Sequence, residues 1–207
     1  MNFSSFFSDQ ARKPSGWFGS IVMPIIFDRG NAFLNRLVHT LMEVQPDERV
    51  LEIGCGTGKL AKMMAKTIET GIIEGIDFSS TMVIIARRKN KSEITRGIVN
   101  IVEDNFDETT SINIPFTKVC CVNTVYFWKD PQNTINKVFD ILEFRGKFIV
   151  AFEDVGQLQR RKISTDVFRL YRANDVERLL KKGGFTNVHI ESTKKGKLLF
   201  HCAVAMK

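Results

Sequence analysis

The sequence predicts an α/β fold with three layers, in which helices cover both faces of a mostly parallel sheet of seven strands. From Arg49 onward, short apolar runs rich in β-branched residues alternate with segments of helical period, which is typical of βαβ units. The first apolar run leads directly into a loop with three alternating glycines. With 207 residues, the chain is long enough for one domain and a short appendage.

The predicted elements follow in order along the chain. The strands are Arg49–Ile53, Ile72–Ile76, Gly97–Val102, Lys118–Val122, Lys147–Phe152, Asn187–Glu191 and Leu198–Val204. The helices between them are Lys59–Thr67, Ser79–Lys89, Pro131–Leu142 and Ala173–Lys182. Only the last two strands are close enough in sequence to form a hairpin, so we expect the last strand to be antiparallel.

Residues 1–46 precede this core, and residues 47–207 form the main domain in our interpretation. Apolar residues at helical spacing predict a helix over Asn31–Val44 that packs on the domain. The run Trp17–Phe27 is mostly apolar and is interrupted by Gly19 and Pro24. It is either a packed helix or turn, or a lid that brings Trp17, Phe18 and Phe27 to an apolar acceptor pocket. A third interpretation is a contact with a membrane surface that delivers a lipid-like acceptor, although basic residues do not interleave through the run as an interfacial helix would prefer.

Cysteine usage and hydropathy place the chain in a reducing, aqueous compartment. The four cysteines have no metal-binding spacing, and the neighbours Cys120 and Cys121 would point to opposite faces of a strand. We therefore expect reduced thiols and no metal site. No run approaches the ~18 apolar residues of a membrane span, and no signal peptide opens the chain. The expected location is cytoplasmic.

The glycine loop after the first predicted strand is the most informative motif. It reads Glu52-Ile53-Gly54-Cys55-Gly56-Thr57-Gly58, with a helix starting near Lys59. Such glycines allow a ligand to approach bare N–H groups at a helix N-terminus. Only three residues separate Gly54 from Gly58, which excludes a P-loop, and Lys59 stands where a dinucleotide fingerprint needs glycine.

Two carboxylates follow predicted strands and refine the expected ligand. Glu52 stands at the end of the first strand, where an acid would repel a pyrophosphate but suits a ligand with an ammonium group. Asp77 ends the second strand, 19 residues after Gly58, where a carboxylate can accept both hydroxyls of a ribose. Asp77 is also a candidate helix N-cap, so its functional interpretation depends on the accompanying motifs.

Together these features resemble the class I S-adenosylmethionine-dependent methyltransferases, which have a Rossmann-like fold. The N-terminal Lys13-Pro14-Ser15-Gly16-Trp17 is more loosely similar to the ubiquinone and menaquinone biosynthesis methyltransferases. The resemblance covers most of the chain and implies S-adenosylmethionine as the cofactor. It implies that the loop surrounds the methionine portion, Asp77 holds the ribose, Phe78 packs on adenine and Asp104 accepts the adenine amine. The full set of implied cofactor residues is Glu52, Gly54, Cys55, Gly56, Gly58, Asp77, Phe78, Met82, Asp104, Asn105 and Asn123.

No catalytic residue is obvious, and methyl transfer from a sulfonium needs mainly alignment of the reactants. If an acid or base takes part, the candidates are Tyr126, His201 and Tyr171; Tyr126 is also a candidate for the acceptor pocket. The Asn-Pro-Pro-Tyr motif of methyltransferases that act on base amines is here Asn123-Thr124-Val125-Tyr126. This difference argues against DNA as the acceptor.

The expected reaction is methyl transfer to an O, N or C nucleophile of a small molecule that is apolar or negatively charged. Residues 151–207 carry 12 basic and 6 acidic side chains, so they hold +6 of the net charge of +7. The clusters Arg160-Arg161-Lys162 and Lys194-Lys195-x-Lys197 are expected at the ligand-binding edge, where an anionic acceptor or partner could approach. Three alternatives stay open: an RNA methyltransferase, a non-catalytic cofactor-binding protein and a nicotinamide dehydrogenase.

Overall fold

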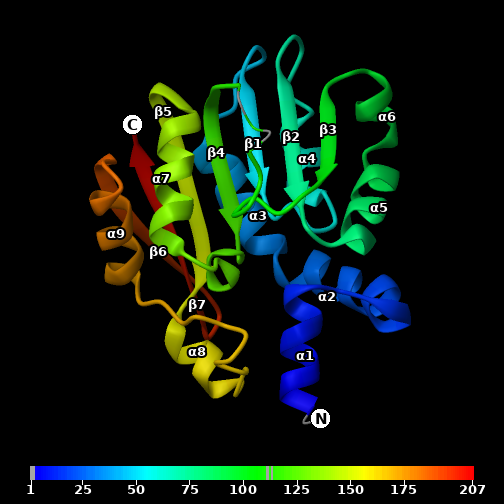
Figure 1. Ribbon diagram of the computed structural model, residues 1–207, viewed down its shortest axis with the longest axis vertical. Coiled ribbons are helices and arrows are strands. Elements are labelled where there is room, and N and C mark those ends of the chain that lie inside the picture. The colour runs from blue at the N-terminus through cyan, green and yellow to red at the C-terminus, as the bar shows by residue number, and fades with distance from the viewer. Residues whose placement is uncertain (1–2, 111, 113) are drawn as a thin grey trace.

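The sheet has seven strands in the order β3-β2-β1-β4-β5-β7-β6, as the computed structural model shows for residues 3–110, 112 and 114–207 (Figure 1). Neighbouring strands pair in parallel, except that β7 runs antiparallel to both β5 and β6. The fold class predicted from the sequence, including the antiparallel last strand, is therefore confirmed. The strands are β1 (Arg49–Ile53), β2 (Ile72–Asp77), β3 (Val99–Glu103), β4 (Phe116–Val122), β5 (Leu142–Glu153), β6 (Thr186–Lys195) and β7 (Leu198–Met206).

Helices cover both faces of the sheet and enclose two apolar clusters. One cluster joins the sheet to α3 (Ala32–Met42), α4 (Lys59–Met64) and α5 (Ser80–Lys89), and the other joins it to α7 (Pro131–Ile141) and α9 (Ala173–Lys182). Cys120 belongs to the first cluster and Cys121 to the second, because successive strand residues point to opposite faces. All four cysteines are buried free thiols.

Several short helices complete the chain. The N-terminal part contains α1 (Phe3–Arg12), the π-helical segment η1 (Phe18–Val22) and α2 (Met23–Gly30). The others are α6 (Lys91–Thr95), the 3₁₀ turn η2 (Val125–Phe127) and α8 (Val155–Arg160). In Figure 1, α1, α2 and α8 lie beyond the same edge of the sheet, the edge at which the parallel strands end. Within the described part of the chain, no helix is both long and apolar enough to cross a membrane.

Some predicted boundaries were wrong. The predicted helix Lys59–Thr67 ends at Met64, and the predicted strand Asn187–Glu191 extends to Lys195 in β6. Most of β6 is exposed on the outer edge of the sheet, so its sequence lacks the apolar alternation that would have shown its length. The domain boundary at residue 46 stays a prediction, since α3 packs directly into the sheet's core cluster.

Candidate functional site

A cavity of about 290 Å³ lies at the carboxyl ends of the parallel strands. Its wall comes from the ends of β1, β2, β4 and β5 on one side and from α1, α2, α8 and the loop after α8 on the other. In open parallel sheets, ligands bind at this edge, where the strand order reverses beside the first strand. The described wall residues include Gly54, Gly56, Asp77, Phe78, Met82, Asp104, Asn105 and Asn123, all predicted for the cofactor.

The three glycines of the loop differ in what surrounds them. All have positive φ angles, 69° at Gly54, 52° at Gly56 and 69° at Gly58, a conformation that side chains disfavour. A Cβ atom at Gly54 would lie 2.1 Å from Thr124 Cγ2, and one at Gly58 would lie 2.5 Å from Asn90 Nδ2. A Cβ at Gly56 would meet no atom within 4 Å. Gly54 and Gly58 therefore allow close packing, whereas Gly56 leaves bare backbone at the cavity.

Asp77 is held rigidly at the end of β2. The backbone N–H of Gly56 donates to its Oδ2 over 2.8 Å, and the N–H of Ser79 donates to its Oδ1 over 2.9 Å. Burial raises the pKa of the carboxyl group, and these two hydrogen bonds oppose the shift. Each carboxylate oxygen can accept more than one hydrogen bond. Asp77 can therefore receive two further donors from a ligand in the cavity.

Glu52 faces the side of the sheet covered by α4 and is not part of the cavity wall. Its side chain is 4% exposed, and its Oε2 has no hydrogen-bond partner among the described residues. Burial raises its pKa to about 8, the N–H of Ala61 opposes this shift, and the nearby Asp77 adds to it. A buried carboxyl group with an unused oxygen beside the glycine loop fits a site that is completed by a cationic ligand.

Cys55 and Gly58 also lie outside the cavity wall. The Cys55 side chain is buried against the backbone of Gly75, where a Cβ atom would lie 3.1 Å from its Sγ. Burial raises the pKa of this thiol well above its usual value, with smaller contributions from Asp77 and Glu52. A thiol with a raised pKa is a poor nucleophile, so Cys55 acts as a small packing residue at the base of the loop.

A chain of hydrogen bonds crosses the wall of the cavity from β5 to Asn31, which lies between α2 and α3. The N–H of Glu153 donates to the Tyr126 hydroxyl over 2.6 Å, and this hydroxyl donates to Asn123 Oδ1 over 3.1 Å. Asn123 Nδ2 then donates to Asn31 Oδ1 over 2.9 Å. Burial raises the pKa of Tyr126 well above its usual value, so the hydroxyl stays protonated. Tyr126 can orient Asn123 but cannot serve as a strong base.

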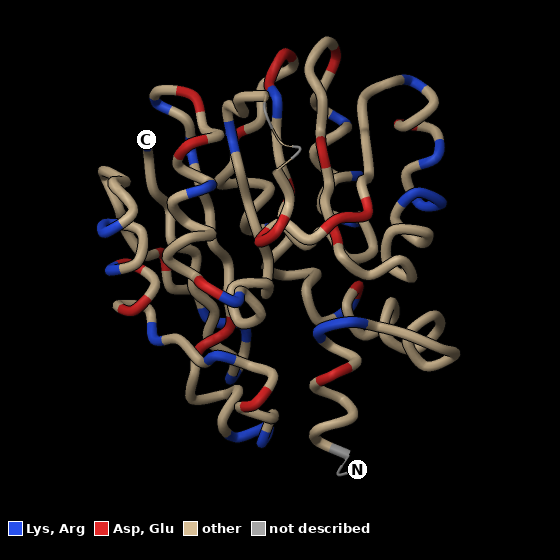
Figure 2. Tube along the Cα trace, in the orientation of Figure 1, with Lys and Arg blue, Asp and Glu red and all other residues tan. Residues whose placement is uncertain are grey.

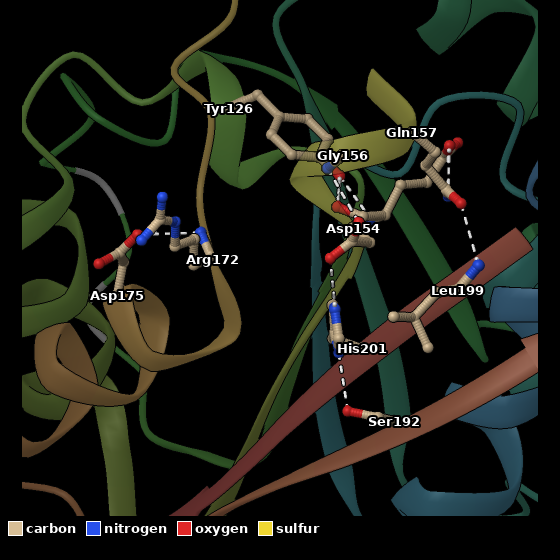
Figure 3. A network of polar contacts seen from close by, with 10 residues as sticks. Tyr126, Asp154, Gly156, Gln157, Arg172, Asp175, Ser192, Leu199 and His201 are labelled. Carbon is tan, nitrogen blue, oxygen red and sulfur yellow. Dashed lines mark hydrogen bonds and ion pairs between the residues drawn. The ribbon is translucent and has the colours of Figure 1, made fainter. Parts of the chain in front are cut away.

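The other two catalytic candidates do not line the cavity. His201 lies on β7 between Ser192, 2.8 Å from its Nδ1, and Asp154, 3.4 Å from its Nε2 (Figure 3). Its ring also packs against Phe152, with the ring centroids 5.3 Å apart. Tyr171 is buried in the apolar cluster beneath α9. Packing and local hydrogen bonding account for the position of His201, and burial in the apolar cluster accounts for that of Tyr171. A catalytic role for either stays a prediction.

The predicted acceptor-pocket residues of the N-terminal segment separate into three environments. Phe27 lines the cavity. Phe18 packs edge-on against Phe6 of α1, with ring centroids 5.2 Å apart. The Trp17 side chain is 71% exposed and lies outside the cavity wall. The structure therefore brings only Phe27 of these three to the cavity, together with Tyr126.

Several wall residues were missed by sequence reasoning. These are Asn31, the cation Arg12 and the apolar residues Phe7, Ala11, Leu158, Ile163 and Phe168. Arg161 also lines the cavity, but it was not missed. The four-residue spacing of Phe7 and Ala11 was a weak helical signal. Arg161 belongs to the basic cluster that the sequence placed at this edge, and it forms an ion pair with Glu153 over 2.8 Å. This position agrees with the expected placement of the cluster.

Comparison with known proteins supports this interpretation of the fold. Residues 50–146 match a family model described as a methyltransferase domain. A putative methyltransferase, YrhH, of Bacillus subtilis is 27% identical over 62% of this chain and 72% of its own length. The malonyl-[acyl-carrier protein] O-methyltransferase of Bacillus cereus is 24% identical over 64% of this chain and 49% of its own length. The chain thus spans about half the length of that second relative.

Solved structures show the same fold at low sequence identity. A putative methyltransferase of Haloferax volcanii, solved in complex with the Trm112 methyltransferase activator, has a TM-score of 0.77 at 14% identity and covers 91% of this chain and 95% of its own. A phosphoethanolamine N-methyltransferase of Haemonchus contortus, solved with S-adenosylhomocysteine, has a TM-score of 0.71 at 16% identity over 94% of this chain and 53% of its own.

The fold, the glycine loop with Asp77 and the matched domain define a methyltransferase. The matched domain over residues 50–146 and the methyltransferase relatives support an enzyme of the class I S-adenosylmethionine-dependent methyltransferases.

Proposed function

We propose that the cavity binds S-adenosylmethionine and that the enzyme methylates the carboxylate oxygen of a small apolar acid. The observation that carries this proposal is the continuity of the cavity. Gly56, Asp77 and Asn105 lie in the same wall as the cations Arg12 and Arg161. One space can therefore hold a cofactor on the strand ends and an acceptor beneath the N-terminal helices and α8.

The cofactor portion of the proposal rests on matched chemistry at two acids. Asp77 has remaining acceptor capacity for the two ribose hydroxyls, and Gly56 leaves room for a ligand against bare backbone. Glu52 lies close to the loop, and an ammonium group of the cofactor beside it would lower its raised pKa and so favour the charged carboxylate. When bound, the cofactor supplies an activated methyl group on a sulfonium.

The acceptor portion follows from the rest of the wall. Phe27, Leu158 and Phe168 present apolar surface, which suits a hydrocarbon body. Arg12 is exposed at the wall and forms no ion pair with any residue in the described ranges, so it can bind an anionic group. The malonyl-[acyl-carrier protein] O-methyltransferases among the relatives also bear a name that indicates an O-methylated acceptor.

A carboxylate acceptor needs no general base in the proposed mechanism. Tyr126 stays protonated, so it can donate a hydrogen bond but cannot remove a proton. A carboxylate is already deprotonated at neutral pH and can attack a methyl carbon without a base. The chain's own residues would then hold the acceptor in line and exclude water, with Asn123 oriented by Tyr126 and Asn31.

The test is transfer of a labelled methyl group to a panel of medium-chain fatty acids and the amines and alcohols of equal length. The expected product is labelled methyl ester from the acids only, recognised because alkali releases the label as methanol. An Arg12→Gln variant should raise the KM for the acid without changing cofactor affinity. Transfer to the amines alone would overturn the acceptor assignment.

The cofactor assignment needs a separate readout. A ligand that binds only the folded state raises Tm, so S-adenosylmethionine and S-adenosylhomocysteine should raise it and NAD should not. A rise with NAD alone would instead favour a dehydrogenase. Cofactor binding without transfer to any acceptor would favour the non-catalytic alternative.

A further inference from the structure

The N-terminal segment carries an exposed row of large apolar side chains along η1 and α2. The exposed fractions are 71% for Trp17, 49% for Ile21, 49% for Ile25 and 36% for Ile26. Trp17, Ile21 and Ile25 follow one another at four-residue intervals, which places them along one side of a helix. We call these four residues the apolar stripe. Large apolar side chains grouped on a surface commonly mark a contact site.

The opposite side of the same segment is fixed to the protein. Gly19 and Met23 are buried, and Phe27 lines the cavity. A Cβ atom at Gly19 would lie only 2.6 Å from the backbone of Pro14 and 3.0 Å from Gln10 Oε1. η1 therefore packs closely against the C-terminal part of α1 and the residues that follow it. The apolar stripe therefore faces outward because the opposite side of this segment packs firmly against the protein.

The exposed charged residues that flank the apolar stripe most closely in sequence are cations. Arg12, Lys13 and Arg29 are exposed. The acid of this segment, Asp28, is turned inward, where its carboxylate pairs with Lys89 over 2.7 Å and accepts from the Thr57 hydroxyl over 2.5 Å. Figure 2 shows η1 and the first part of α2 as a stretch without charge. The surface thus combines Trp and Ile with flanking cations, the composition of helices that lie in a membrane interface.

We propose that the apolar stripe docks the enzyme on an anionic lipid bilayer, with the acceptor cavity opening beside the contact. Ile26 belongs to both the stripe and the cavity wall, and Phe27 follows it in that wall, so the two features are continuous. Lipid phosphates would match Arg12, Lys13 and Arg29. In a symmetric dimer these cations would face one another and repel. A second copy of the chain is therefore a less favourable partner for the stripe than an anionic bilayer.

This inference goes beyond the proposed function, because docking on lipid does not require any particular acceptor. Vesicle binding and methyl transfer are measured separately, so either can fail without the other. The probe is phosphatidylcholine vesicles with and without phosphatidylglycerol, mixed with the full chain and sedimented. We expect the protein to sediment with the vesicles that contain phosphatidylglycerol.

The variant Ile21→Ser/Ile25→Ser tests the apolar stripe, since neither residue lines the cavity. The matched control is Ile84→Ser/Phe144→Ser, which removes side chains that are 66% and 80% exposed on α5 and β5. The stripe variant should weaken vesicle binding by more than about tenfold, because interfacial binding scales with buried apolar area. The control variant should bind vesicles as the original protein does, and both variants should keep the same cofactor affinity.

Tryptophan fluorescence gives an independent readout. Trp17 is 71% exposed and Trp128 only 6%, so entry of Trp17 into lipid should shift the emission to shorter wavelength. The Trp17→Phe variant should lose this shift but still bind vesicles. No binding to phosphatidylglycerol vesicles, or equal binding by the stripe and control variants, would overturn the proposal. A dimer in solution that the stripe variant abolishes would also overturn it in favour of a second copy.

Discussion

At the scale of single residues, Glu52 is a carboxyl group whose ionisation is strongly altered by the fold. Its pKa is about 8 in the folded chain against a reference value of 4.5, and burial is the main cause. Between these two values the folded state holds a proton that the unfolded state has released. The contribution of Glu52 to stability therefore decreases as the pH rises through this interval and is constant outside it.

The corresponding prediction compares the original protein with Glu52→Gln. The free energy of unfolding of the original protein relative to the variant should fall by a few kcal/mol between pH 5 and 8, the interval set by the reference value of 4.5 and the folded pKa of about 8, because each pKa unit corresponds to about 1.4 kcal/mol. Urea denaturation of both proteins across this pH range measures the difference. A difference that is independent of pH would show that Glu52 does not titrate abnormally.

The residues predictable from sequence are those that a motif marks. Gly54, Gly56 and Asp77 stand at fixed offsets from the ends of β1 and β2, and parallel strands bring their carboxyl ends together. Arg12 and Asn31 could not be found in this way. They reach the cavity only because the N-terminal helices fold over the strand ends, a long-range arrangement that no local spacing encodes.

At the scale of elements, the link between α2 and the glycine loop depends on Asp28. Its carboxylate accepts from Thr57 of the loop and pairs with Lys89 of α5, and its carbonyl accepts from Lys59 of α4 over 2.8 Å. One residue thus joins α2 to the glycine loop, to α4 and to α5. Binding of the cofactor at the loop would be coupled to the order of α2 through these contacts.

We predict that Asp28→Asn loosens η1 and α2 while the sheet is unchanged. Local opening of residues 17–30 should become easier by about 1 kcal/mol, since the pair is partly exposed and is screened by solvent. Hydrogen exchange measures this as faster exchange within those residues, with Asp9→Asn, an exposed change on α1, as the matched control. Equal exchange in the two variants would argue against a tether at Asp28.

The helices and strands that the sequence predicted correctly are those with a clear pattern of apolar residues. The strands β1, β2 and β4 are buried apolar runs and were correctly placed. α8 has only six residues and follows β5 directly, so it offered too short a pattern to recognise. The role of Trp17–Phe27 was open because its exposed and buried sides are both apolar.

At the scale of the whole molecule, the sheet edge collects features that are far apart in sequence. The glycine loop, α1, α2 and α8 meet there around one cavity. The basic C-terminal part contributes Arg161 to this wall, where its charge is paired with that of Glu153. The central claim is that this cavity is built for S-adenosylmethionine and that Asp77 holds its ribose.

Calorimetric titration of S-adenosylmethionine into the original protein and Asp77→Ala tests that claim most directly. Loss of two hydroxyl donors to a carboxylate, worth about 3 kcal/mol together, should weaken binding about 100-fold. Thermal unfolding should confirm that the variant stays folded, and Asp140→Ala, an exposed change on α7, should bind as the original does. Equal affinity of the original protein and the folded Asp77→Ala variant would contradict the account.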